Sequence, residues 1–227
     1  MRFVRTALFA LALAAAPAAM LPTDAEASVM IAVPFDALVK DADAVAVVLP
    51  LESKSVWEDG RITTYTRVKV DKGVAGETGA SEVWIRTLGG VVGKIGQLVD
   101  GEPVLAPSKP SLLFLRRFKA GDNWEVSARA QGQYPVLVDE VTKAKKVIRS
   151  MNMGVLLAPK AKVAPGSNGP GLSPQSVSPV VTDGPISAEA KQPRLASDVL
   201  HDRPLDDVAR EIAATWKRLH TTTSTTR

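Results

Sequence analysis

The residues of this chain that could do chemistry are few, and their supply excludes several kinds of active site. The chain has no cysteine and only two histidines, His201 and His220. These histidines flank a predicted helix, and their separation of about 19 residues corresponds to roughly 28 Å along a straight axis, too far to share a metal ion. Because the chain has no cysteine, a thiolate site is excluded. A Ser-His-Asp triad and a histidine-based zinc site are excluded from the strand-rich part of the chain.

The glycine-rich stretch of residues 86–101 is the next candidate, with glycines at positions 89, 90, 93, 96 and 101. A P-loop ending at Gly93-Lys94 would need glycine at position 88 and serine or threonine at position 95, where this chain has Leu88 and Ile95. A dinucleotide-binding turn would need a following helix, and the prolines after the stretch preclude a long one. Two interpretations stay open: the glycines permit a tight corner in a barrel, or the stretch is a recognition loop. The candidate ligand-binding residues of such a loop are Thr87, Gly89, Gly90, Gly93, Lys94, Gly96 and Gln97.

Adjacent carboxylates are the remaining source of hydrolytic chemistry, and none of the pairs has the spacing of a calcium-binding loop. Such pairs commonly cap helices, form turns or lie on exposed faces. The pairs are Asp41 with Asp43, Asp139 with Glu140, and Asp206 with Asp207. From these patterns we predict no catalytic residue, no cofactor and no metal ligand.

Residues 61–71 offer a candidate groove for an acidic ligand. They alternate with period two, as a half-buried strand does, and their basic side chains fall on one face. The same alternation also occurs on ordinary solvent-facing strands. The groove residues would be Arg61, Arg67, Lys69 and Arg86, with Tyr65 and Trp84 nearby.

The elements that position these residues are mostly strands. Short strand-like patterns follow one another at near-regular spacing, which predicts an antiparallel barrel or sandwich. A short helix over residues 34–43 precedes them, and Asp59-Gly60 predicts a hairpin turn. The predicted strands cover residues 44–53, 61–71, 82–87, 111–116, 124–129, 132–139 and 146–149.

The clearest helix covers residues 204–219. Asp202 is a potential N-cap, Pro204 suits a first turn, and the basic residues Lys217 and Arg218 fall at the negative end of the dipole. Its apolar stripe predicts packing on the body of the protein itself. The stripe consists of Leu205, Val208, Ile212, Trp216 and Leu219.

The first residues predict export. A basic start, an apolar run over residues 7–16 and small residues at the expected cleavage point indicate a signal peptide, with Ser28 as the first mature residue. The run is too short to span a bilayer, so we expect no transmembrane helix in the mature chain. An exported chain without disulfides is typical of a periplasmic or secreted bacterial protein. The formal net charge of +4 is scattered, which indicates no nucleic-acid partner.

The expected organisation follows from these patterns and from a change in composition after residue 157, where proline, glycine and serine become frequent. We expect a signal peptide (1–27), a β-barrel domain (28–157), a flexible linker (158–200), a C-terminal helix (201–220) and a disordered tail (221–227).

Five stretches resemble a family of uncharacterised bacterial secreted proteins. They are "FDALVKDADAVAVV", "WEDGRITTYTRVKVDKGVAG", "EVWIRTLGGVVGKIGQLVDGEP", "SLLFL" and "QGQYPV", within Pro34 to Arg149. The core of this family is similar to the OB-like barrel of tissue inhibitors of metalloproteinases and netrin modules. The resemblance implies a mainly β, small antiparallel OB-like barrel. The named inhibitors act through an N-terminal cysteine, which this chain lacks.

The leading hypothesis for function is an exported, non-enzymatic binding module. Its ligand would be an extracytoplasmic protein or a surface polymer, with the glycine-rich stretch at the rim of the site. Two alternatives stay open. A carboxylate-dependent hydrolase would need Asp or Glu side chains converging in a pocket, and a proteinase-inhibitor-like protein would need an exposed, protruding edge.

Overall fold

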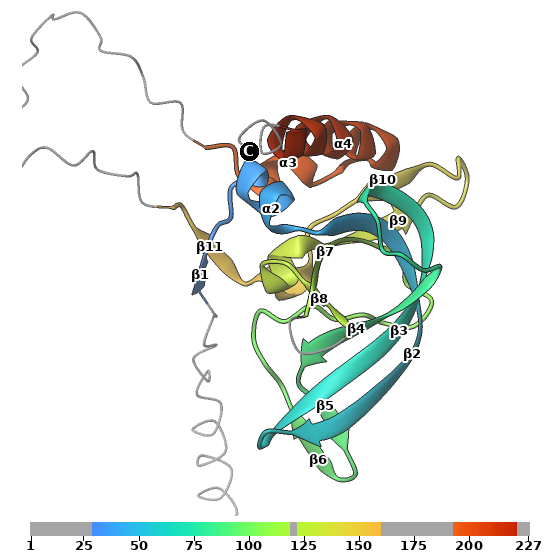
Figure 1. Ribbon diagram of the computed structural model, residues 1–227, viewed down its shortest axis with the longest axis vertical. Coiled ribbons are helices and arrows are strands. Elements are labelled where there is room, and N and C mark those ends of the chain that lie inside the picture. Colours follow the sequence, from blue (N-terminus) through green and yellow to red (C-terminus); the bar gives the residue numbers. More distant parts are fainter. Residues whose placement is uncertain (1–28, 119–121, 160–192, 222–227) are drawn as a thin grey trace, which may run out of the picture.

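The computed structural model describes residues 29–118, 122–159 and 193–221. This part of the chain is mainly β, with a closed five-stranded barrel and helices gathered on one side of it (Figure 1). The predicted fold class is therefore confirmed. Among the described residues, no helix combines the length and the apolar character needed to cross a membrane. The predicted signal peptide and the end of the predicted tail lie outside these ranges.

A long hairpin forms the framework of the barrel. β2 (Ala44–Glu58) and β3 (Arg61–Gly76) pair through the turn Asp59-Gly60, in which both residues have positive φ, as a type I′ turn requires. The register shifts next to Pro50, which has no N–H for the ladder. Both strands run beyond their predicted ends at residues 53 and 71, because cross-strand pairing overrides the local loop preferences.

Three further strands close the barrel. β4 (Glu82–Leu88) pairs with β3, and β7 (Ser111–Arg117) pairs with β2. β8 (Trp124–Val126) joins them, parallel to β4 and antiparallel to β7. The order around the barrel is therefore β2-β3-β4-β8-β7, the five-stranded arrangement of an OB-like barrel.

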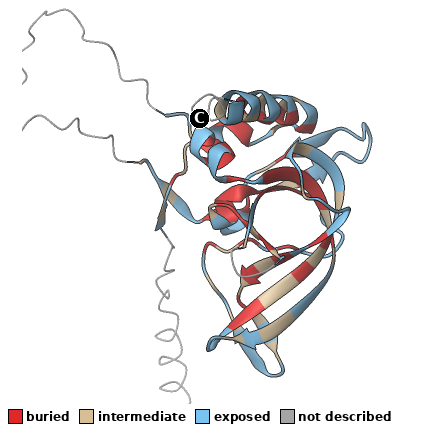
Figure 2. Cartoon of the chain, in the orientation of Figure 1, coloured by how far each residue is buried: buried red, intermediate tan, exposed pale blue. Residues whose placement is uncertain are grey.

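Two apolar cores lie on the two faces of the barrel wall. Buried residues are found both in the barrel strands and in the helices (Figure 2). Successive residues of a strand point to opposite faces, so Ala44, Ala46 and Val48 fill the barrel while Val45 and Val47 pack outside it. This explains why the start of β2 is apolar at every position. The interior is completed from the other strands, mainly by Val68, Ile85, Leu113, Leu115 and the fully buried Trp124.

A helical layer covers the outer core. α2 (Phe35–Asp41) buries Phe35, Leu38 and Val39, and it packs beside α4 (Leu205–Thr221). The predicted stripe of α4 faces this core: Leu205, Val208 and Ile212 are buried, and Trp216 and Leu219 are packed against them. The predicted packing of the C-terminal helix on its own body is confirmed.

Two predictions in this region are wrong. Residues 196–200, assigned to the linker, form α3 (Ala196–Leu200), which is anchored by the Ala196 N–H bond to Val33 O and by buried Leu200. Asp202 does not cap α4, because its carboxylate binds Lys146 Nζ at 2.6 Å and Pro204 belongs to a short strand. Residues 160–192 of the predicted linker lie outside the described residues.

The remaining elements extend or flank the barrel. β9 (Gln133–Val138), β10 (Lys145–Val147) and β12 (Arg203–Pro204) continue the sheet beyond β7. β1 (Val29–Ile31) and β11 (Val155–Leu157) form a separate parallel pair. The predicted strand over 124–129 ends early, because Ala128 and Arg129 adopt positive φ and begin the 3₁₀ turn η2 (Arg129–Gly132). A second 3₁₀ turn, η3, spans Met151–Met153.

Candidate functional site

The glycine-rich stretch folds into a short hairpin at the end of the barrel that lies away from the helices (Figure 1). β5 (Gly90–Val92) pairs with β6 (Ile95–Gln97) across the two-residue turn Gly93-Lys94. Gly93 has a φ of +62°, as the first residue of a type II′ turn does. The stretch is followed by turns and irregular chain rather than by a helix, so it lacks the phosphate-facing helix end of a nucleotide-binding loop.

Close packing requires glycine at two of the candidate positions. Gly90 has a φ of +131°, and a Cβ there would overlap Thr64 Oγ1 and lie 2.5 Å from Ser55 Oγ. Gly89 has a φ of +88°, and its Cβ would lie 2.7 Å from Gln97 O. Nothing would meet a Cβ at Gly93. The tight-corner interpretation therefore explains Gly89 and Gly90 through close packing, and Gly93 through turn conformation alone.

Two of the predicted ligand contacts instead bind β3, Gln97 from the hairpin and Thr87 from the neighbouring strand β4. Gln97 Oε1 accepts a hydrogen bond of 2.6 Å from Ile62 N, and the buried Thr87 hydroxyl donates one of 3.4 Å to Thr64 O. The carboxylate of Glu102 accepts a further bond of 3.0 Å from Leu88 N, at the end of β4. The hairpin is therefore a well-anchored part of the fold.

A hollow of about 760 Å³, the hairpin groove, runs beside this hairpin. Of the predicted loop residues, Thr87, Gly89, Gly90, Gly96 and Gln97 line it, whereas Gly93 and Lys94 lie at the tip of the turn outside it. Its other walls come from the barrel strands, from residues 98–105 and from the segment around η3. The structure thus brings part of the predicted loop into a concave surface.

Apolar side chains gather at the rim of the hairpin groove. Leu98 is 87% exposed and Met151 is 94% exposed. Exposed apolar groups that cluster beside a hollow mark interaction surfaces more often than scattered ones do. The exposed apolar residues that line the groove are Val91, Leu98, Val104 and Met151. Ile95 in β6 is also exposed but does not line the groove.

The basic strand residues do not form an open groove for an acidic ligand. Arg67 contacts Glu52 at 2.9 Å and Glu82 at 2.8 Å, and Lys69 contacts Asp71 at 3.4 Å. Arg86 contacts Glu58 at 2.9 Å and lies over the Phe118 ring. Carboxylates of the same protein therefore neutralise these three cations, and this prediction is wrong for them.

Glu58 is the most strongly held carboxylate of this outer face. The Thr63 hydroxyl, the hydrogen bonds from Arg86 and the one from Tyr65 together hold the pKa of Glu58 below its usual range, while desolvation acts in the opposite direction. Thr63 Oγ1 itself has no partner in hydrogen-bonding geometry, so we assign the effect mainly to Arg86 and Tyr65. Burial is the main reason why the pKa of Tyr65 is raised.

The adjacent carboxylates bind backbone N–H groups and cationic side chains of the same chain. Asp43 accepts a bond from Arg117 N at 2.8 Å, and Asp139 accepts three bonds across the turn to Thr142, which lower its pKa. Asp206 binds Lys72 Nζ at 2.8 Å, and Asp207 binds Arg210. No group of three or more metal-ligating side chains is found among the described residues. Both histidines lie on the surface, where His220 stacks on Trp216.

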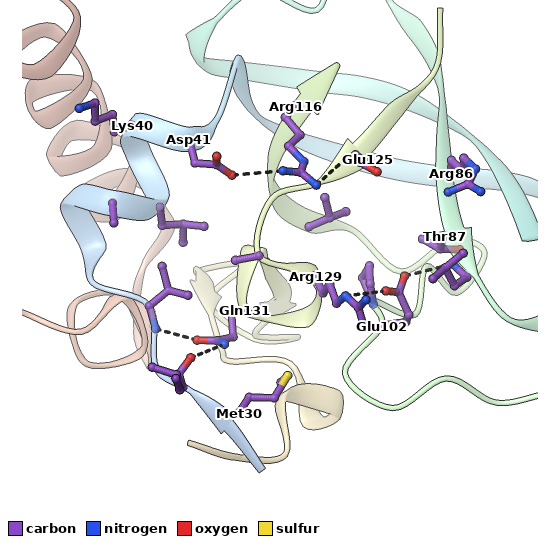
Figure 3. A pocket seen from close by; sticks show the side chains of 18 residues that line it. Met30, Lys40, Asp41, Arg86, Thr87, Glu102, Arg116, Glu125, Arg129 and Gln131 are labelled. Atoms are coloured by element: carbon purple, nitrogen blue, oxygen red, sulfur yellow. Dashed lines mark hydrogen bonds and ion pairs between the residues drawn. The ribbon is translucent and has the colours of Figure 1, made fainter. Parts of the chain in front are cut away.

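A second hollow, of about 1010 Å³, contains the three carboxylates that come nearest to the hydrolase alternative (Figure 3). Glu125 contacts Arg116 at 2.6 Å, Asp41 lies 4.0 Å from the same arginine, and Glu102 contacts Arg129 at 3.3 Å. Each carboxylate therefore faces an arginine, which is not the arrangement of a general acid kept protonated by burial. We call this hollow the arginine pocket.

Two buried glutamines that sequence reasoning missed shape both hollows. Gln131 accepts a bond from Val33 N and donates one to Ile31 O, both 2.9 Å, and so takes the place of a neighbouring strand. Gln133 accepts a bond of 3.1 Å from Val104 N and donates one of 2.6 Å to Val104 O. Their sequence context is an ordinary strand start, so no local signal could have identified them.

No protein-family model, no curated protein and no solved structure matches this chain.

Proposed function

We propose that this protein is an exported, non-enzymatic binding module that holds a protein segment in the hairpin groove. The observation that supports this most directly is the ring of exposed aliphatic side chains around the groove, including Leu98 and Met151. Burying apolar surface contributes about 25 cal/mol per Å², so such a rim gains free energy when a partner covers it. A rigid hairpin also limits the entropy lost on binding.

The character of the groove favours a protein over a surface polysaccharide. Its described lining residues are aliphatic or small and polar, without an aromatic ring on which a sugar could stack. Asp100 and Glu102 are the charged members of that lining. Glu102 is engaged by Arg129 and Leu88 N, whereas no ion pair within the described part of the chain involves Asp100. The expected ligand is therefore a segment with aliphatic side chains and one basic group.

A binding experiment with matched variants tests this proposal. The immobilised protein is exposed to the culture supernatant and envelope fraction of its own cells, and retained proteins are quantified by mass spectrometry. Leu98→Asp and Val104→Asp place a charge in the groove. Val141→Asp is the control, because Val141 is 90% exposed and lies on the turn between β9 and β10.

A protein retained by wild type and by Val141→Asp, but lost from both groove variants, supports the proposal. Asp100→Lys should weaken the same interaction, since it places like charges opposite each other. Equal recovery on all variants would contradict a role for the groove. A retained proteinase would instead favour the inhibitor-like alternative that the family resemblance implies.

Export is a separate part of the proposal and rests on the composition of residues 1–27. Fractionation of the cells followed by N-terminal sequencing tests it. The protein should appear outside the cytoplasm and begin at Ser28. A cytosolic protein that keeps its first residues would contradict this part alone and leave the groove experiment unaffected.

A further inference from the structure

The arginine pocket is separate from the hairpin groove, although the two share a wall made by Thr87-Leu88 and Glu102-Pro103. It lies between α2, β1 and η2 and reaches the outer faces of β4, β7 and β8 (Figure 3). Its volume of about 1010 Å³ is at the upper end of the range of small-molecule sites. It therefore has room for a ligand of its own.

Arg129 is held on the wall of this pocket by an unusual backbone. Ala128 and Arg129 have φ values of +54° and +55°, so two consecutive residues other than glycine are left-handed. Such conformations persist only where surrounding structure enforces them. Here the Ala130 N–H bond to Gly101 O and the tight packing of Gly132 on Ser127 O do so.

The guanidinium of Arg129 has donors to spare. Its Nε lies 3.3 Å from Glu102, and no hydrogen bond to another described residue engages its two Nη groups. Arg116 is similar: one Nη binds Glu125 at 2.6 Å, and the other is 4.0 Å from Asp41, beyond hydrogen-bond length. An arginine presents five N–H donors in a planar fork that matches a carboxylate.

Apolar groups face the same space from the other side. Met30 and Val33 are partly buried and Ile31 is two-thirds exposed, and all three line the pocket. The Gln131 amide fixes this segment by its bonds to Ile31 O and Val33 N. The pocket thus combines an aliphatic wall with two arginines that have unused donors.

The charges of the lining disfavour a highly charged ligand. Glu58 already neutralises Arg86, so three cationic side chains, Lys40, Arg116 and Arg129, face three anionic ones, Asp41, Glu102 and Glu125. This balance disfavours a polyanion such as a nucleotide, whereas a monoanion needs only the unused N–H donors of the two arginines. We propose that the arginine pocket binds a small aliphatic carboxylate, with its headgroup at Arg116 and Arg129 and its chain along Met30 to Val33.

Calorimetric titration with dodecanoate tests the proposal, with methyl dodecanoate and dodecyltrimethylammonium as neutral and cationic probes of similar length. We expect one dodecanoate per chain and binding at least tenfold weaker for the other two probes, because neither carries a negative charge to pair with arginine. Arg129→Gln and Arg116→Gln should each weaken dodecanoate binding about tenfold or more. Arg61→Gln, which removes an exposed charge from the β2–β3 hairpin, should leave it unchanged.

Methionine methyl resonances locate the ligand. Met30 lines the arginine pocket and Met151 lines the hairpin groove, so ¹³C-methyl labelling reports on each hollow separately. Dodecanoate should shift the Met30 signal and leave that of Met151 in place. A shift of Met151 alone, binding unaffected by both arginine variants, or no heat at millimolar dodecanoate would overturn the proposal. If Arg129→Gln does not fold, Arg116→Gln and the Met30 signal still decide it.

Discussion

Alanine substitutions at three glycines separate the cost of positive φ from the cost of lost space. Gly73 has ordinary φ and open surroundings, Gly93 has positive φ and open surroundings, and Gly90 has positive φ with Thr64 and Ser55 against it. All three lie in β3 or in the glycine hairpin. They therefore form a series in which one physical factor is added at each step.

The expected magnitudes follow from these surroundings. Gly73→Ala should stabilise the protein by about 0.5 kcal/mol, because alanine loses less backbone entropy on folding. Gly93→Ala should cost about 1–2 kcal/mol for the left-handed backbone alone. Gly90→Ala adds an overlap that must displace the Thr64 and Ser55 hydroxyls and break their 2.8 Å hydrogen bond, so it should cost about 2–5 kcal/mol in total.

Urea unfolding of the purified protein measures these differences. A loss of about 3 kcal/mol moves the midpoint down by about 1–3 M, and the slope of each curve checks that the variants unfold alike. The triple variant Gly90→Ala/Ser55→Ala/Thr64→Ala lacks both hydroxyls. Its loss of unfolding free energy should be smaller than the sum of the losses of the three single variants. If Gly90→Ala proves no more harmful than Gly93→Ala, the close approach of the hairpin to β2 and β3 is refuted.

Three other changes probe separate parts of the molecule. Ile212→Ala leaves a cavity under α4 and should lower the free energy of unfolding by about 2–5 kcal/mol, whereas Ala213→Ser on the exposed face of α4 should change it little; equal effects in urea unfolding would show that α4 does not pack as described. Gln131→Leu leaves Val33 N and Ile31 O without their partner and should cost about 1–3 kcal/mol, with faster hydrogen exchange at Val33; unchanged exchange there would contradict the bond. Glu58 has a lowered pKa when folded, so its stabilisation is present above the ordinary carboxyl pKa and is lost as pH falls through the folded value. Glu58→Gln should therefore flatten the fall in stability between about pH 5 and about pH 3, and a fall as steep as that of wild type would refute this assignment.

The strands could be predicted where burial leaves a local pattern. Alternation over residues 61–71 predicts β3, and the continuous apolar run at 44–48 becomes intelligible once both faces of the wall are covered. α3 left no such pattern. Its five residues follow a stretch rich in proline and glycine, and contacts with Val33 and the outer core stabilise it.

The site could be predicted only in part, because its walls come from distant segments. The repeated glycines indicate backbone with positive φ or close packing, and five of the seven candidate residues line the hairpin groove. Leu98, Val104 and Met151 become neighbours of one hollow through tertiary folding. Likewise, Arg129 is an ordinary basic residue in the sequence, and only the left-handed backbone of the folded chain gives it a distinctive position.

The packing of α2 against α4 has a consequence for how the molecule is made. A ribosome delivers Phe35 and Leu38 before the barrel strands, whereas their partners Val208 and Ile212 emerge after all of those strands. Until then these apolar side chains have no cover on that side, so the nascent chain cannot complete its structure piece by piece. The outer core is therefore completed only when α4 docks on α2 and β3.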